Sequence, residues 1–116
     1  MMEPSRINLK TWIGDFYQDD NMVVFDHLKV IPTSHNSCAY SPKYQRYCLP
    51  YIWAKCQNLS IQDQLHIGVR GFDLRLRLTK NIEVSNINIV HYFKSTYHLH
   101  QVIYEVIHFL NENPNE

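Results

Sequence analysis

The sequence has 116 residues, of which 45% are hydrophobic and 19% charged, with 11 basic and 11 acidic side chains. This length and composition predict one globular domain over residues 1–116 and exclude a wholly disordered chain. A net charge of zero argues against a nucleic-acid partner, and against attraction to anionic membranes by charge alone.

The chain shows no targeting or metal-binding pattern. Residues 1–10 lack the apolar stretch of a secretory signal, and no apolar run reaches the roughly 18 residues of a membrane helix. We therefore expect a cytoplasmic protein with reduced cysteines. Cys38, Cys48 and Cys56 lack the spacing of a disulfide framework or a zinc site, so a metal-binding module is the least favoured interpretation.

The first half predicts a helix, a strand and a long loop. A helix over residues 9–17 places Leu9, Trp12, Ile13 and Phe16 on one face, and residues 1–22 form a lead-in helix and turn. A strand over residues 23–31 ends at a proline. The polar loop over residues 33–50 is long enough to suggest a function.

The next segment predicts a capped helix followed by a strand. Ser60 and Asp63 form a helix start, and Gly68 suits the helix exit. Residues 71–78 alternate strictly, which predicts one continuous strand with an apolar and a charged face. A solvated charged face is the favoured reading of that pattern, and a barrel interior is the alternative. The apolar face holds Phe72, Leu74, Leu76 and Leu78, and the charged face holds Asp73, Arg75 and Arg77.

The last part predicts a further strand and the clearest helix. Residues 87–91 alternate and end at His91. An amphipathic helix follows and ends at Asn113. Strands interleaved with helices predict an α/β protein with parallel pairing. The apolar stripe of the helix consists of Leu99, Val102, Ile103, Val106, Ile107 and Leu110.

Two histidines lie where α/β proteins form their sites. His35 follows the first strand and His91 ends a later one, and such a pair can act as general base and general acid. A structural role is the alternative for each histidine alone. His98 and His100, at the start of the last helix, are expected to face apart rather than to bind a metal.

An aromatic stretch leaves two readings open. It can form a surface that meets lipid, or it can pack within the loop. The stretch consists of Tyr40, Tyr44, Tyr47, Tyr51 and Trp53.

Several segments together resemble the X domain of phosphatidylinositol-specific phospholipase C, in particular the small X-domain-only proteins. Residues 30–37, VIPTSHNS, are similar to the family segment IPGSHDS. Gln57 and residues 61–75, IQDQLHIGVRGFDLR, resemble the most specific block, QL..GVRyfDLR. Residues 87–91 resemble the strand of the second family histidine, and residues 106–116 resemble ei..fL..nPeE.

The resemblance implies the N-terminal part of a phospholipase C-like (β/α) barrel, incomplete because a whole barrel needs about 250 residues. His35 then matches the general base, His91 the general acid, and Arg75 an arginine beside the phosphate in the metal-independent branch. Asn36 and Asp73 match supporting residues.

The implied activity is hydrolysis of a phosphoinositide or related phosphodiester, with no calcium or other cofactor expected because Arg75 stands in the place of a carboxylate ligand. Peripheral membrane contact follows if the substrate is a lipid. The alternative is a truncated, inactive relative that binds a phosphoinositide, or that folds as an oligomer or with a partner.

One departure from the family pattern predicts strain. Thr33 stands at the family glycine before the first histidine, where a positive φ would disfavour a β-branched residue. Tyr92 stands where a glycine often follows the second histidine.

Overall fold

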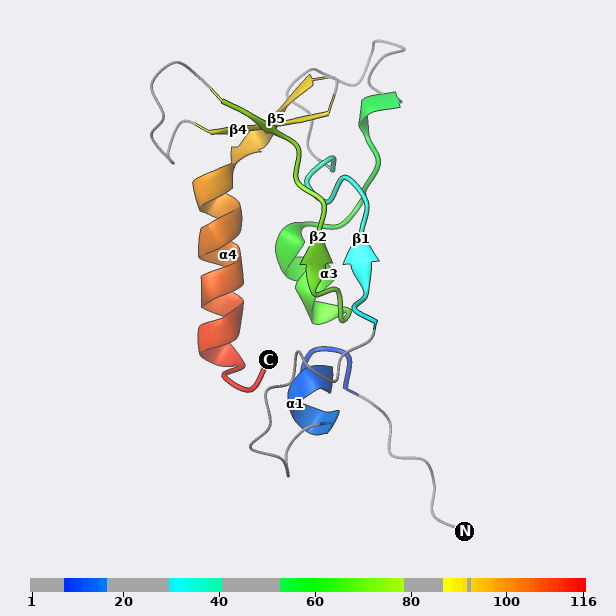
Figure 1. Ribbon diagram of the computed structural model, residues 1–116, viewed down its shortest axis with the longest axis vertical. Coiled ribbons are helices and arrows are strands. Elements are labelled where there is room, and N and C mark those ends of the chain that lie inside the picture. Colours follow the sequence, from blue (N-terminus) through cyan, green and yellow to red (C-terminus); the bar gives the residue numbers. More distant parts are fainter. Residues whose placement is uncertain (1–7, 17–29, 41–52, 79–86, 92) are drawn as a thin grey trace.

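The computed structural model describes residues 8–16, 30–40, 53–78, 87–91 and 93–116, which form helices and two small sheets (Figure 1). The α/β class is thereby confirmed, whereas the barrel stays a prediction. The strand expected over residues 23–31 lies mostly outside the described residues. In chain order the elements are α1 (Trp12–Phe16), β1 (Thr33–Ser34), α3 (Ile61–His66), β2 (Gly71–Phe72), β3 (Leu76–Arg77), β4 (Asn88–His91), β5 (Phe93–His98) and α4 (Leu99–Glu112).

The first sheet pairs β1 with β2 in parallel, which agrees with the predicted pairing, with Thr33 opposite Gly71. The position of β1 corrects the prediction, because residues 33–34 were expected to begin the loop. Thr33 causes no strain, because Asn36 is the one non-glycine residue with a positive φ among the described residues. A Cβ atom at Gly71 would overlap the Thr33 hydroxyl. The family pattern has glycine at the position of Thr33 and tyrosine at the position of Gly71. The small and the larger partner have therefore exchanged places across this strand pair.

The second sheet corrects two predictions. The expected strand over residues 71–78 is interrupted, because residues 73–75 separate β2 from β3. Furthermore, β4 pairs antiparallel with β3, and β5, which the sequence did not predict, pairs antiparallel with β4. A parallel connection needs a crossover of a dozen or more residues, usually a helix. Residues 78–87, which connect β3 to β4, are too few for such a crossover, so antiparallel pairing is the arrangement that this connection permits.

The capped helix α3 forms as predicted. The Ser60 hydroxyl accepts a hydrogen bond from the Asp63 backbone N–H at 3.1 Å, and the Asp63 carboxylate accepts one from the Ser60 N–H at 3.3 Å. Gly68 follows the helix with φ +98°, a conformation that a side chain would strain. The Gly68 carbonyl accepts a hydrogen bond from Trp12 Nε1 at 3.0 Å, which ties α1 to the end of α3.

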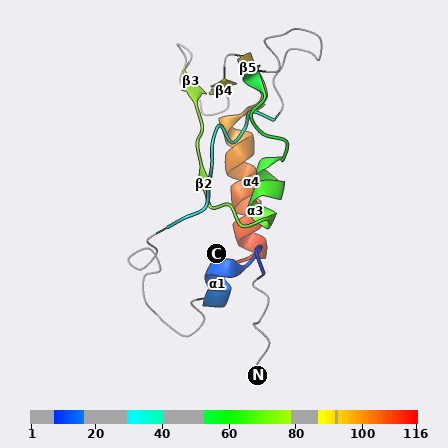
Figure 2. The same cartoon turned by 90° about the vertical axis from the view of Figure 1, so that its right-hand side faces the viewer.

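Helix α4 packs beside α3 (Figure 2), but only part of the predicted apolar stripe faces the core. Val102 and Phe109 are buried and Val106 packs on the core, whereas Ile103 and Ile107 are exposed. The core contacts therefore centre on one edge of the predicted stripe. The buried core consists of Cys38, Ile61, Leu65, Ile89, Val102 and Phe109.

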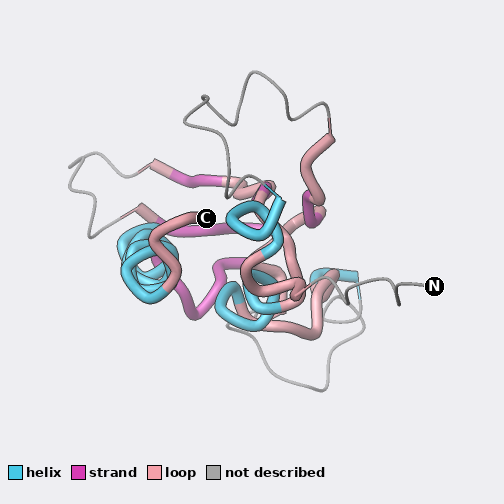
Figure 3. Tube along the Cα trace, turned by 90° about the horizontal axis from the view of Figure 1, so that it is seen from below, coloured by secondary structure: helices cyan, strands magenta, loops and turns pink. Residues whose placement is uncertain are grey.

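Arg70, which directly precedes β2, joins four parts of the chain. Its guanidinium pairs with the Glu116 carboxylate, and the two side chains are only 8% and 1% exposed. It also donates to the Leu65 and Lys10 carbonyl oxygens, each at 2.8 Å, and lies 4.8 Å from the centre of the Phe109 ring. Seen from below, the C-terminal segment runs from the end of α4 toward the other helices (Figure 3).

The exchange between Thr33 and Gly71 generates a testable prediction. Gly71→Ala should lower the free energy of unfolding by about 1–3 kcal/mol, because the added methyl group overlaps the threonine hydroxyl. Thr33→Gly should cost less than about 1 kcal/mol, and it should remove most of the penalty of Gly71→Ala in the double variant. Denaturant unfolding of the four proteins measures this coupling. Additive penalties would contradict the packing argument.

Candidate active site

The site begins with a tight turn that follows β1. Asn36 has φ 47°, a left-handed conformation that asparagine tolerates better than most residues. The turn returns the chain toward the end of β2, where the Ser37 N–H donates to the Asp73 carbonyl at 3.0 Å. The Asp73 N–H donates in turn to the Ser34 carbonyl at 3.2 Å. Residues 35 and 36 are thereby held against Asp73.

A buried glutamine supports the turn from below. The Gln64 Nε2 group donates to the Ser37 carbonyl at 2.8 Å and to the Leu59 carbonyl at 2.9 Å. Its Oε1 atom accepts from the Ser34 hydroxyl at 2.5 Å. Because each polar atom of this buried amide has a partner, the turn is fixed without the cost of an unsatisfied group.

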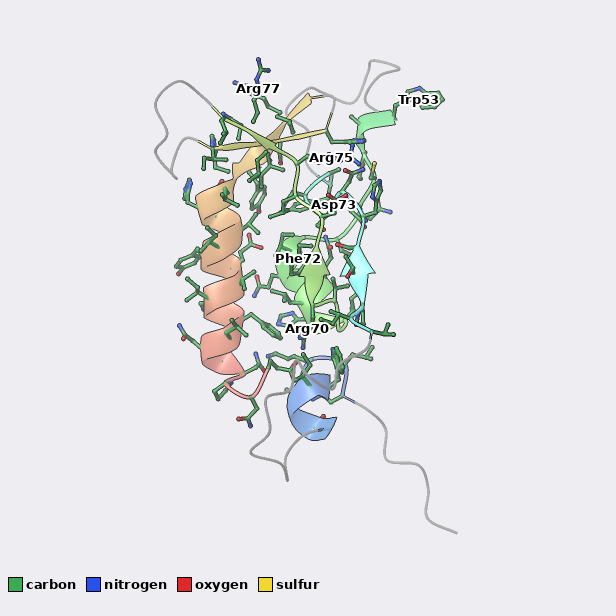
Figure 4. The ribbon with its side chains drawn as sticks, viewed as in Figure 1. Trp53, Arg70, Phe72, Asp73, Arg75 and Arg77 are labelled. Atoms are coloured by element: carbon green, nitrogen blue, oxygen red, sulfur yellow. The ribbon has the colours of Figure 1, made fainter. Side chains whose placement is uncertain are left out.

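The Asp73 carboxylate is the centre of the site. Its Oδ2 atom lies 3.1 Å from His35 Nδ1, accepts from the Asn36 N–H at 3.1 Å, and lies 4.0 Å from Arg75 Nη2. Figure 4 shows Asp73 and Arg75 just beyond β2, while Arg77 points away at the upper edge. The structure therefore brings four of the five predicted site residues together.

The contacts of His35 assign its ring nitrogens. An ionised carboxylate only accepts hydrogen bonds, so Nδ1 carries the hydrogen toward Asp73, and Nε2 keeps its lone pair in the neutral ring. Asn36 Nδ2 lies 2.8 Å from Nε2 and donates to it. The His35 side chain is 70% exposed, so Nε2 lies within reach of a ligand from solvent.

His91, the fifth predicted residue, ends β4 on the other side of the same cleft. Its Nδ1 atom lies 3.0 Å from the Ala54 carbonyl oxygen, which can only accept, so Nδ1 again carries the hydrogen. The Val90 N–H donates to the Arg75 carbonyl at 2.8 Å, which fixes the end of β4 beside Arg75. The cleft is lined by Asn36, Cys38, Ala39, Ala54, Asp73, Arg75, Ile89, Val90, His91 and Ser95.

Two residues that contact the site, Gln57 and Cys56, were not among the predicted site residues. Gln57 Nε2 donates to the His35 carbonyl at 2.6 Å, and Cys56 Sγ lies 3.6 Å from His91 Nδ1. Gln57 stood in the family block and could have been assigned a supporting role. A cysteine without a paired spacing gave no signal for Cys56.

The remaining candidates fall outside this site. The His98 and His100 rings stack, with centroids 5.8 Å apart, instead of facing apart as predicted. Within the described part of the chain no cluster of three or more His, Cys, Asp or Glu residues is arranged to hold a metal ion.

Two residues of the aromatic stretch are described, and one is packed within the fold while the other is exposed. Tyr40 packs on Tyr97 with ring centroids 5.3 Å apart, and burial raises its pKa. Trp53, by contrast, is exposed. The other aromatic residues of this stretch, Tyr44, Tyr47 and Tyr51, lie outside the described residues. Tyr92, the departure from the family pattern after the second histidine, also lies outside them.

Comparison with known proteins supports one family. A PI-PLC X-box domain-containing protein of Dictyostelium discoideum is 33% identical to the chain over 122 residues, which is 95% of this chain and 16% of that protein. The chain is PI-PLC X-domain-like. No family model and no solved structure matches it. This PI-PLC X-domain-like chain spans about a sixth of the length of its relative. The similarity therefore does not establish an activity for this chain. None of the helices described here is long and apolar enough to span a bilayer.

The role of Asp73 can be tested without substrate. Asp73→Asn should lower the free energy of unfolding by about 1–3 kcal/mol, because the Asn36 N–H and His35 Nδ1–H lose a charged acceptor. It should also change the imidazole ¹⁵N shifts of His35. The exposed Asp15→Asn is the control. An unchanged His35 spectrum in Asp73→Asn would contradict this assignment of the hydrogen bond.

Proposed function

We propose that the chain carries part of a phosphodiesterase centre of the PI-PLC X type, which cleaves a phosphoinositide or related phosphodiester by general acid/base catalysis. The observation that carries this proposal is the Asp73 carboxylate, which gathers His35, Asn36 and Arg75 beside the cleft that Arg75 and His91 line. The family resemblance supplies the reaction, and the barrel that would complete the centre is part of the same proposal.

His35 is the proposed general base. Its Nδ1–H is held by Asp73, so Nε2 can take the proton of the inositol 2-hydroxyl group once Asn36 Nδ2 gives way to that hydroxyl. The deprotonated oxygen attacks phosphorus and forms a new P–O bond. The bond from phosphorus to the diacylglycerol oxygen breaks in line with this attack.

His91 is the proposed general acid. With Nδ1–H directed at the Ala54 carbonyl, the protonated ring offers its Nε2 proton to the departing diacylglycerol oxygen. Arg75 is half-exposed in the cleft, and its guanidinium can neutralise charge on the phosphoryl oxygens. Each side chain thereby has a role that its observed contacts permit.

Hydrolysis of phosphatidylinositol, followed by ³¹P NMR, tests these roles. His35→Ala and His91→Ala should each lower kcat about 10²–10⁴-fold, and Arg75→Ala about 10²–10³-fold. Arg77→Ala is the matched control, because Arg77 lies in β3 and points away from Asp73 (Figure 4). Undiminished turnover in either histidine variant would refute the mechanism.

The same assay, run with a calcium chelator, tests the cofactor proposal. A guanidinium at position 75 supplies the positive charge that a cation would otherwise bring to the phosphate. Turnover should therefore persist in the chelator. Loss of turnover that calcium restores would contradict the metal-independent form of the proposal.

We also propose peripheral contact with the lipid surface through Trp53. This side chain is 76% exposed and directly precedes Ala54, whose carbonyl holds His91. An exposed indole beside the cleft suits the interface between water and lipid. Trp53→Ala should weaken binding to phosphatidylinositol vesicles about tenfold in a sedimentation assay, with Leu76→Ala, an exposed residue of β3, as the control. Equal binding by both variants would contradict this contact.

The alternative, an inactive relative that binds a phosphoinositide or a partner protein, predicts a different outcome. The native polypeptide would bind inositol phosphates without turnover, and His91→Ala would leave that binding unchanged. Because the chain covers 16% of its relative, these assays use the native polypeptide, whose intact mass is measured first.

A further inference from the structure

Cys56 lies between the two histidines of the candidate site. Its Sγ atom is 3.6 Å from His91 Nδ1 and 3.7 Å from Asn36 Nδ2. That same Asn36 Nδ2 atom lies 2.8 Å from His35 Nε2. One sulfur atom therefore contacts His91 directly and His35 through a single amide group.

The neighbouring groups determine the direction of these contacts. Because His91 Nδ1–H points to the Ala54 carbonyl at 3.0 Å, it can only donate to the sulfur of Cys56. Asn36 Nδ2 is also a donor. The other amide atom, Asn36 Oδ1, is buried and has no hydrogen-bond partner among the described residues, so Nδ2 makes the polar side-chain contacts of Asn36. The sulfur is thus an acceptor between two N–H groups.

Backbone contacts fix the position of this sulfur. The Cys56 and Gln57 N–H groups both donate to the Ala39 carbonyl, at 3.0 Å and 3.3 Å. Gln57 Nε2 donates to the His35 carbonyl at 2.6 Å. Residues 56–57 are therefore held against the turn that carries His35, and Sγ lies beside His91 as a consequence of backbone pairing.

We propose that Cys56 is a positioning residue, whose sulfur is a second acceptor for His91 Nδ1–H beside the Ala54 carbonyl and links His91 to the Asn36–His35 pair. This inference rests on the proposed function. With Nδ1–H engaged by both the Ala54 carbonyl and the sulfur, Nε2 is the ring nitrogen that would carry the reacting proton in the proposed reaction. The other charged and titratable groups at this site are His35, Asp73 and Arg75, which contact one another through the Asp73 carboxylate.

The exposure of Cys56 also makes the link accessible to thiol reagents. Cys56 is exposed, whereas Cys38 is buried in the core, and burial raises the pKa of Cys38 to about 12. In methyl methanethiosulfonate treatment the thiolate attacks the sulfenyl sulfur, a disulfide to S–CH₃ forms, and methanesulfinate leaves. The added group occupies the space between His91 and Asn36.

The test uses the native polypeptide with Cys48→Ser as background and compares Cys56→Ala with Cys56→Ser. The alanine variant should lower kcat about tenfold with little change in KM, since misplacement of a reacting group costs rate rather than binding. The serine variant, which keeps an acceptor, should restore part of that loss. The thiol reagent should inhibit the background protein reversibly with dithiothreitol, and it should not affect Cys56→Ser.

A spectroscopic measurement separates this proposal from the proposed function. The imidazole ¹⁵N shifts of His91 should report an Nδ1–H ring in the background protein and should change in Cys56→Ala, in which Nδ1–H keeps the Ala54 carbonyl but loses the sulfur. If His91 responds in this way but no variant hydrolyses phosphatidylinositol, the proposed function fails and the positioning role stands. If hydrolysis occurs while the His91 spectrum and kcat are the same in Cys56→Ala, the positioning role is wrong.

Discussion

The buried ion pair between Arg70 and Glu116 is the constraint on which the described structure depends. Removing one partner of such a pair costs about 3–5 kcal/mol, because the other charge stays buried and unpaired. The Arg70 guanidinium also donates to the carbonyl oxygens of Leu65 in α3 and of Lys10, and it lies over the ring of Phe109 in α4. The Gly14 N–H adds a hydrogen bond to Glu116 Oε1 at 3.0 Å. One side chain thereby sets how α1, α3, α4 and β2 lie together.

The candidate site lies at the opposite end of β2, three residues from this anchor, and its environment is different. Asp73 is about one-third exposed and shares its charge among His35, Arg75 and a backbone N–H. Rigid support for these exposed groups comes from beneath, from Gln64 and the left-handed turn at Asn36. The buried Gln64 amide, whose polar atoms all have partners, supports exposed polar groups of His35 and Arg75, an arrangement suited to binding a ligand from solvent.

Local signals predicted the elements that depend on neighbouring residues alone. The Ser60–Asp63 cap, the exit at Gly68 and the helix ending near Asn113 all follow from hydrogen-bond chemistry within a few residues. The interruption of the strand over residues 71–78 had no such signal, since alternation is kept through the break. The antiparallel return of β4 was predictable from its short connection, but β5 was not, because polar residues between its apolar ones hid the strand.

The sequence by itself determined the α/β class, the family resemblance and the five candidate site residues, because each rests on residue type and local spacing. Only the tertiary structure decided which of them meet. A carboxylate at Asp73 contacts His35 across 38 positions of sequence only because β1 and β2 pair in parallel. The link from Cys56 to His91 likewise depends on backbone pairing between residues 39 and 56, a long-range contact that no local pattern encodes.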